Sequence, residues 1–172
     1  MPMTTAPARA EAAEYYFKYI DQVEQGDICR ILETQGEETL ALLREVSSER
    51  SLHRYESSKW SIRDVVAHIN DTERLFVFRA LWFARGFDSE LPSFEPDIAA
   101  ASADADGRPW SSHVEEFRSV RAATVTFFDS LAPDAWSRRG IASGNPFSVR
   151  ALAYLAAGHV THHVKILREK YL

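Results

Sequence analysis

The chain has 172 residues, of which 45% are hydrophobic and 26% charged, so it can form one domain with a substantial core. Its net charge of −5 and the lack of a Lys/Arg-rich run argue against a nucleic-acid partner, and no apolar run approaches the length of a membrane span. The first residues lack the apolar core of a signal peptide, so we expect a cytoplasmic protein with no membrane association.

The N-terminal segment, residues 1–26, differs in composition from the rest of the chain. Residues 1–10 are small, polar and contain proline, which predicts a frayed or draped terminus. Residues 12–23 are rich in tyrosine and phenylalanine and are followed by a glycine. We expect residues 1–26 to form an extension that packs on the domain that follows, residues 27–172.

Two long amphipathic helices are predicted in the first half of this domain, the first over about residues 27–46. Its apolar stripe shifts phase near Gly36, whose low helix propensity weakens the middle of the helix by about 1 kcal/mol. The second helix has the clearest start, because Ser61 can cap it and Asp64 stands at the acidic position of a capping box. Its apolar pattern continues to Gly86, a residue suited to end a helix.

A long connection, residues 87–110, separates the second helix from the third. We expect it to be irregular, because it contains prolines and a tract of small residues. Its length suggests either a crossover or a lid over a functional site. We expect the part from Pro92 to Asp97, including Phe94 and Glu95, to pack beside the site; a tether remote from the site is the alternative.

Two further helices complete the pattern. The third is predicted to begin near Ser112, with Glu115 in the capping-box position, and to end before Pro133. The fourth is predicted to begin near Ser148 and to run to Leu172. Strand signals are weak throughout, so we predict an all-α fold: a four-helix bundle with an N-terminal extension and a long connection between helices 2 and 3.

Three of the six histidines fall on predicted apolar helix faces. At about 100° per residue, His159 lies near the centre of the apolar face of the fourth helix, and His163 lies one turn further on. His162 falls nearer the edge of this face. His68 lies within the apolar face of the second helix, so two helices direct imidazoles into one interior, where unsatisfied polar rings cost free energy.

A divalent metal ion would satisfy these rings. The His-x-x-x-His spacing brings two nitrogens to one ion, and a third imidazole from a neighbouring helix leaves positions open for chemistry. We therefore predict a metal site formed by His68, His159 and His163, to which zinc, nickel, cobalt and iron(II) are suited. The alternative for each histidine alone is a hydrogen-bonded core residue or a surface residue.

Other polar residues of the second helix are candidates for catalysis. Asp71 lies one turn from His68 and Thr72 shares its face, so either can orient an imidazole, although Asp71 fits a solvent-facing charge equally well. Arg79 lies on the same face, where it can bind an anionic substrate group or pair inside the bundle. We expect Glu73 to belong to a surface ion pair.

No other catalytic motif stands out: the chain has no supported Ser-His-Asp arrangement and no Gly-rich phosphate loop. The single cysteine, Cys29, cannot form an internal disulfide. It is far from the histidines in the sequence, and we expect a buried thiol.

Two segments resemble the DinB-like superfamily, a family of metal-dependent enzymes named after DNA-damage-inducible proteins. They are SKWSIRDVVAHINDTERLFVFRALWFARG and FSVRALAYLAAGHVTHHVKILREKYL. The shared pattern is a Trp-Ser start, a histidine two turns into the second helix, and a Gly-His-x-x-x-His run on the last helix. The chain is also similar, more distantly, to thiol-dependent S-transferases and to the mycothiol-dependent isomerase. The resemblance extends over about residues 27–172.

This resemblance implies several functional expectations. It assigns the ligand roles to His68, His159 and His163, favours nickel or zinc with water in the open position, and implies a homodimer. For the reaction it implies transfer of a low-molecular-weight thiol to a small-molecule electrophile, with metal-dependent hydrolysis as the alternative. A non-catalytic metal- or ligand-binding protein of the stress response remains as the other class.

Overall fold

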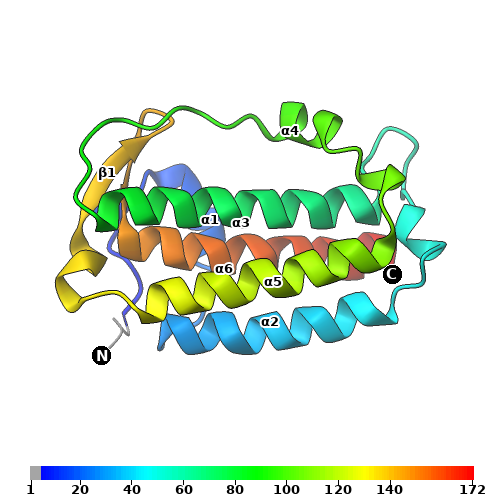
Figure 1. The fold of residues 1–172 in the computed structure, drawn as a ribbon, viewed down its shortest axis with the longest axis horizontal. Coiled ribbons are helices and arrows are strands. Elements are labelled where there is room, and N and C mark those ends of the chain that lie inside the picture. Colours follow the sequence, from blue (N-terminus) through cyan, green and yellow to red (C-terminus); the bar gives the residue numbers. More distant parts are fainter. Residues whose placement is uncertain (1–4) are drawn as a thin grey trace.

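Four long helices lie side by side and span most of the length of the molecule (Figure 1). The structure is a computed structural model that describes residues 5–172; residues 1–4, the start of the predicted frayed terminus, lie outside the described residues. The fold is the predicted four-helix bundle, all-α apart from one short hairpin. The bundle helices are α2 (Ile28–Glu45), α3 (Ile62–Ala84), α5 (Trp110–Asp129) and α6 (Val149–Ile166).

Shorter elements fill the connections and the N-terminal segment. They are η1 (Arg9–Glu11), η2 (Glu14–Tyr16), α1 (Phe17–Ile20), η3 (Arg50–Leu52), α4 (Pro96–Ser102), η4 (Ala105–Gly107), η5 (Pro133–Ser137), β1 (Arg139–Ala142), β2 (Asn145–Ser148) and η6 (Leu167–Tyr171).

The order of the helices around the bundle explains the long connection. α2 and α3 each pack against both α5 and α6, so α2 and α3 occupy opposite corners. Figure 1 shows that α3 and α5 point the same way, so the chain between them must return along the bundle. This return contains α4 and η4, and the expectation of a wholly irregular connection is wrong. Pro96 suits the first turn of α4, and the alanines after it favour helix.

The predicted starts of three bundle helices are confirmed by their capping hydrogen bonds. The Asp27 side chain accepts backbone N–H groups at the start of α2. Ser61 accepts the N–H of Asp64 at 3.0 Å, and Asp64 accepts the N–H of Ser61, which forms the predicted capping box of α3. Ser148 accepts an N–H of the first turn of α6 at 2.9 Å. After α3, Gly86 adopts a φ of 83°, as a helix-ending glycine does.

The start of α5 differs from the prediction. The helix begins at Trp110, directly after Pro109, and Ser112 is not its cap. The Ser112 hydroxyl instead donates to the carbonyl oxygen of Pro109 at 2.7 Å, from within the first turn. Proline fixes the backbone direction at this point without a side-chain cap, so the serine signal misplaces the start.

A buried polar network joins the four bundle helices. Glu73 is only 2% exposed and pairs with Arg121 of α5 at 2.8 Å, so its predicted place on the surface is wrong. Arg121 also donates to the carbonyl oxygen of Leu32 at 2.9 Å and to the side-chain oxygen of Gln35 at 2.8 Å. Gln35 donates in turn to the carbonyl oxygen of Ala157 in α6 at 2.9 Å. The network therefore fixes α6 relative to the other three helices.

α6 lies at the centre of the molecule. All its residues from Ala151 to Val160 are buried, because neighbouring elements surround it. Within residues 5–172, no helix is both long and apolar enough to cross a membrane.

A two-stranded hairpin, which the sequence analysis missed, lies directly before α6. β1 and β2 pair antiparallel, and the two residues between them, Ser143 and Gly144, have φ values of 52° and 70°. Such a turn suits a two-residue hairpin, and the Ser-Gly pair is the signal that could have revealed it. Leu91 of the long connection donates to Ile141 at 3.0 Å, so the hairpin also anchors that connection.

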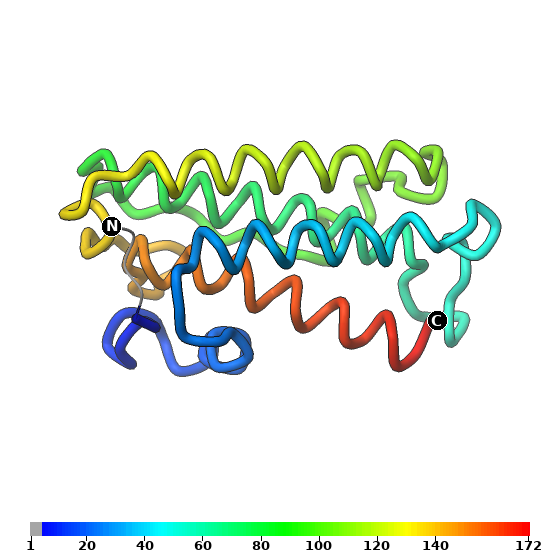
Figure 2. Tube along the Cα trace, turned by 90° about the horizontal axis from the view of Figure 1, so that it is seen from below, coloured from blue at the N-terminus to red at the C-terminus, as the bar shows by residue number. Residues whose placement is uncertain are grey.

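The N-terminal segment packs against α6, as Figure 2 shows in blue. Gly158 makes this contact possible, because a Cβ at this position would lie 2.2 Å from the carbonyl oxygen of Tyr19. The close approach places the Tyr19 ring 5.8 Å from the ring of His159, which follows Gly158 in α6.

Candidate metal centre

Three imidazoles from two adjacent helices converge on one point. Nε2 of His159 lies 3.0 Å from Nε2 of His68 and 3.1 Å from Nε2 of His163. The ligand atoms of all three rings lie within 4.8 Å of one another. The cluster includes His163 and not His162, as the phase of the helix predicts; the role of the three rings as metal ligands stays a prediction.

The three rings are neutral at physiological pH. Burial lowers the pKa of His68 to about 4 and that of His163 to about 3, with the neighbouring histidines lowering the latter further. The pKa of His159 is lowered well below its ordinary value, first by burial and then by His163 and His68. A neutral imidazole carries one ring proton, so the three converging nitrogens cannot satisfy one another by hydrogen bonds alone. This donor set fits a divalent transition-metal ion, which accepts the lone pairs of neutral imidazoles.

His113 provides a contrast within the same protein. It is fully buried, and its Nε2 lies 2.9 Å from the carbonyl oxygen of Ala105. This pairing with a backbone carbonyl oxygen is usual for a core histidine.

Thr72 contacts His68, which lies one turn before it in α3. Its hydroxyl lies 3.3 Å from Nδ1 of His68, so it can fix the orientation of the ring. Asp71 instead lies 3.4 Å from Arg74 and does not line the cavity described below. Of the two candidates considered for this contact, the structure brings Thr72 to the cluster and leaves Asp71 outside it.

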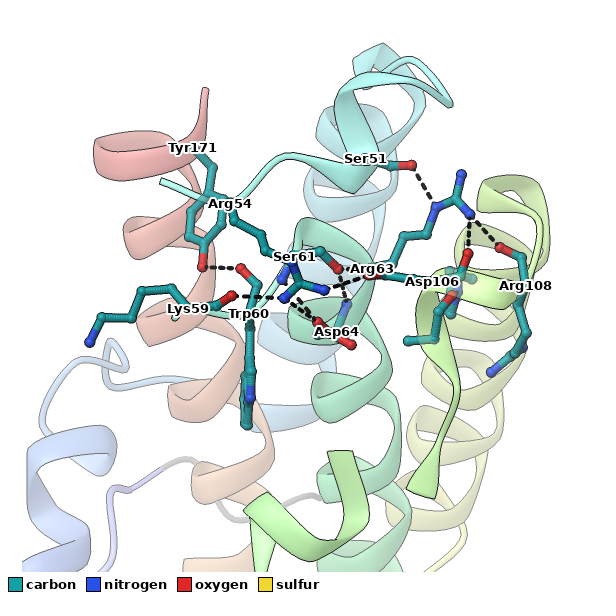
Figure 3. Close-up of polar contacts among 12 residues, drawn as sticks. Ser51, Arg54, Lys59, Trp60, Ser61, Arg63, Asp64, Asp106, Arg108 and Tyr171 are labelled. Carbon is teal, nitrogen blue, oxygen red and sulfur yellow. Dashed lines mark hydrogen bonds and ion pairs between the residues drawn. The ribbon is translucent and has the colours of Figure 1, made fainter. Parts of the chain in front are cut away.

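Polar contacts surround the start of α3 and fix the backbone at Trp60 and Ser61 (Figure 3). The Tyr171 hydroxyl donates to the carbonyl oxygen of Trp60 at 2.8 Å. The neighbouring Ser61 hydroxyl donates to Asp106 at 2.6 Å. The Trp60 ring lies 5.0 Å from the ring of His68.

Arg63 extends this network to the two loops that flank the end of the bundle (Figure 3). It donates to the Ser51 hydroxyl at 2.8 Å and to the carbonyl oxygens of Asp106 and Arg108 at 2.9 and 2.8 Å. Sequence reasoning missed Arg63 and Trp60 as supports of the site, because their partners lie in distant segments.

A cavity of about 420 Å³ opens beside the cluster. Its walls come from the N-terminal segment, α3, α6, the hairpin turn and the long connection. Phe94, Pro96 and Asp97 belong to these walls, so the prediction that part of residues 92–97 packs beside the site is confirmed. Glu95 does not line the cavity. The aromatic wall residues are Tyr15, Tyr16, Tyr19, Trp60, Phe76 and Phe94.

The candidate Arg79 and the single cysteine, Cys29, occupy different surroundings. Arg79 lines the cavity, where its side chain donates to the carbonyl oxygen of Pro92 at 3.3 Å and to the Ser143 hydroxyl at 2.8 Å. Cys29 lies in the core, outside the cavity, and burial raises its pKa to about 11. The thiol is therefore protonated at neutral pH, and its burial confirms the expectation from the sequence.

This arrangement can support Lewis-acid chemistry. Neutral ligands leave the full charge of a divalent ion in place, and three protein ligands leave coordination positions for a reactant. An ion of this kind lowers the pKa of a bound water or thiol and polarises an electrophile.

Comparisons with known proteins relate the chain to a family. The sequence profile of the DinB superfamily matches residues 31–167. No curated protein matches the chain. Its fold is similar to that of YfiT from Bacillus subtilis, described as a probable metal-dependent hydrolase with an unusual four-helix bundle topology, with a TM-score of 0.69 and 17% identity over 94% of this chain and 91% of that chain.

The fold is also similar to the crystal structure of the mycothiol-dependent maleylpyruvate isomerase. The TM-score is 0.68 with 11% identity, over 84% of this chain and 61% of that chain. At these identities the structural likeness shows the fold alone, whereas the profile covers most of the chain. The chain therefore belongs to the DinB superfamily.

Proposed function

We propose that this protein is a metal-dependent enzyme that transfers a low-molecular-weight thiol to a small electrophilic molecule. One divalent ion, nickel or zinc, would be held by His68, His159 and His163. The observation that carries the proposal is the convergence of three neutral imidazoles on a cavity of about 420 Å³, which suits a small organic reactant. The ion would supply the Lewis acid that favours thiolate over thiol at neutral pH.

The chain itself would supply orientation and shielding. The Thr72 hydroxyl holds the ring of His68, and the aromatic walls keep bulk water away from the reacting sulfur. Because a free thiol ionises near pH 8.5, it needs less activation than water and no strong general base. Among residues 5–172, Asp97 is the one carboxylate residue that lines the cavity.

Hydrolysis is the second candidate, and Asp97 is the observation that favours it. Its carboxylate belongs to the cavity wall and could accept a proton from an attacking water. The fold neighbour YfiT is described as a probable hydrolase. An Asp97→Asn variant separates the two reactions, because it should lower ester hydrolysis at least tenfold and leave thiol conjugation within about twofold.

The test begins with metal analysis of protein purified without added metal. Conjugation of cysteine to 1-chloro-2,4-dinitrobenzene and hydrolysis of 4-nitrophenyl acetate are then measured before chelation, after chelation and after reloading with nickel or zinc. We expect metal-dependent conjugation that exceeds hydrolysis. A metal-bound protein that accelerates neither reaction would instead favour the non-catalytic binding class, and hydrolysis alone would favour the second candidate.

The assembly and location of the protein are also proposals. We propose a cytoplasmic homodimer that does not bind nucleic acid. The exposed side chains of Phe78 and Leu81 on α3 offer an apolar surface for self-association. Light scattering at several protein concentrations tests the dimer, and a monomer at all of them would contradict it.

A further inference from the structure

Arg79 is a buried cation without a carboxylate partner. It is 3% exposed, and no carboxylate of residues 5–172 forms an ion pair with it. The other buried arginines differ from it: Arg121 pairs with Glu73 at 2.8 Å, and Arg63, which does not line the cavity, donates from all three of its guanidinium nitrogens to oxygen atoms. A buried charge without a counter-charge is costly, and such a charge on a cavity wall indicates a site for an anionic ligand.

The donors of the Arg79 guanidinium are only partly used. Nη2 makes both hydrogen bonds of the side chain, to the carbonyl oxygen of Pro92 and to the Ser143 hydroxyl. Nε is buried and has no acceptor among residues 5–172, and Nη1 makes no hydrogen bond to these residues. Because a guanidinium stays protonated in proteins, these unused donors remain available to a carboxylate.

One face of α3 connects Arg79 to the histidine cluster. His68, Thr72, Phe76 and Arg79 follow one another at helical spacing and all line the same cavity. The rise of the helix separates the α-carbons of His68 and Arg79 by roughly 16 Å, and both residues line the cavity. The cavity therefore has imidazoles at one end and a guanidinium at the other, and the aromatic side chain of Phe76 lies between them.

Phe76 of α3 and Tyr16 of the N-terminal segment line this middle part, and the core residue Phe147 contacts Tyr16. The Phe76 ring lies 6.0 Å from the ring of His159, and Tyr16 lies 4.8 Å from Phe147. The guanidinium carbon of Arg79 lies 5.9 Å from the centre of the Phe147 ring. A ligand that complements these groups along the cavity has an apolar middle and an anionic end.

We propose that Arg79 binds the carboxylate of an apolar reactant and directs the opposite end of that molecule toward the histidine cluster. The orientation of the reacting end toward the cluster rests on the proposed function. The contact between the carboxylate and Arg79 does not. The substrate class is thus an amphipathic carboxylic acid, and the carboxylate belongs either to the electrophile or to the thiol.

Binding of a matched acid and amide tests the contact without turnover. Calorimetry compares 3-phenylpropionate with 3-phenylpropionamide on chelator-treated and metal-loaded protein. We expect the acid to bind roughly tenfold or more tightly in both states, as a charge-assisted contact allows. Arg79→Gln should remove this preference, and Arg79→Lys should retain part of it. Arg85→Gln, which changes an exposed arginine just after the same helix, should keep the full preference.

The outcomes separate this proposal from the proposed function. Equal binding of acid and amide by the unaltered protein would overturn it, as would a preference that disappears on chelation, since the carboxylate would then bind the ion. The same preference in a protein that fails to bind nickel or zinc on reloading would support the Arg79 site and refute the metal-dependent reaction. Circular dichroism of both Arg79 variants establishes whether each is folded. If the glutamine variant does not fold, the lysine variant is used for the comparison.

Two conjugation assays identify the reactant that bears the carboxylate. One compares cinnamate with cinnamamide as the electrophile for a single thiol. The other compares N-acetylcysteine with its amide as the thiol for a single electrophile. If Arg79→Gln removes a preference for the acid, the carboxylate belongs to the reactant that was varied in that assay. The absence of an Arg79-dependent preference in both assays would overturn the proposal.

Discussion

At the scale of single residues, His159 links the other two imidazoles, because its Nε2 contacts both of theirs. Replacement of His159 by Ala should lower metal affinity by more than about 100-fold, since two neutral ligands hold a divalent ion poorly. Mass spectrometry of dialysed protein measures the bound metal. His162→Ala removes the neighbouring imidazole outside the cluster and should retain the metal; equal metal content in both variants would contradict the ligand assignment.

Thr72 should affect the metal through the ring of His68. Thr72→Val keeps the shape of the side chain but removes the hydroxyl 3.3 Å from Nδ1, so metal affinity should fall about tenfold. Competition with a chromogenic chelator measures the affinity. Thr72→Ser keeps the hydroxyl and should behave as the unaltered protein, and identical affinities for the valine and serine variants would refute the orienting role.

The buried histidines should also make the stability of the metal-free protein depend on pH. In the folded state the pKa of His68 is about 4 and that of His163 about 3, against an ordinary value of 6.5. Between pH 6.5 and 4 the unfolded chain therefore binds more protons, so the free energy of unfolding should fall as the pH falls through this range. Above pH 6.5 these groups are neutral in both states and contribute no pH dependence.

Urea denaturation of metal-free protein at pH 7.5 and 5.0 measures this effect. A His68→Gln, His163→Gln double variant lacks the two titrating rings and should lose less stability between these pH values. The same loss in both proteins would show that other groups cause it.

At the scale of elements, Gly158 governs the contact between α1 and α6. Gly158→Ala should displace the backbone at Tyr19, which a Cβ would approach to 2.2 Å, and cost about 1–3 kcal/mol of stability. Chemical denaturation measures the loss, and limited proteolysis should cut the N-terminal segment faster. Gly26→Ala is the control, since its Cβ would lie 3.5 Å from Ile31. Equal stability of the two variants would contradict the prediction.

The elements also show which parts of the fold a sequence can predict. The starts of α2, α3 and α6 were predictable because Asp27, Ser61 and Ser148 act on N–H groups only a few residues away. The hairpin was missed because its four-residue strands gain stability from contacts with distant segments, such as Leu91. α4 was missed because this short helix of seven residues lies within a segment whose prolines and small residues are typical of a loop.

The same distinction applies to the candidate site. Helical periodicity alone places the three histidines on apolar faces, and the structure brings them together. The position of Trp60 against His68 depends on contacts with distant residues such as Tyr171. Arg79 was recognised as a candidate, but its lack of a buried counter-charge could be seen only once the neighbouring elements were in place.

At the scale of the whole molecule, two buried apolar clusters and the Glu73–Arg121 pair stabilise the bundle without a metal. Chelation at pH 7.5 should therefore leave the helical circular dichroism signal nearly unchanged and lower the melting temperature, because the ion stabilises only the folded state. Refolding of the chelated chain in the presence of nickel or zinc should restore the original melting temperature. Complete unfolding on chelation would mean that the metal is structural.

The histidine cluster joins α3 to α6, and α6 is the last of the four bundle helices to be synthesised. A nascent chain that has released α3 but not α6 carries only His68 of the three, and a single imidazole holds a divalent ion weakly. If the cluster binds a metal as proposed, the ion would be acquired only after translation of the bundle. Chains that stall on the ribosome or terminate before α6 would not sequester the ion, so metallation would report that the fold is complete.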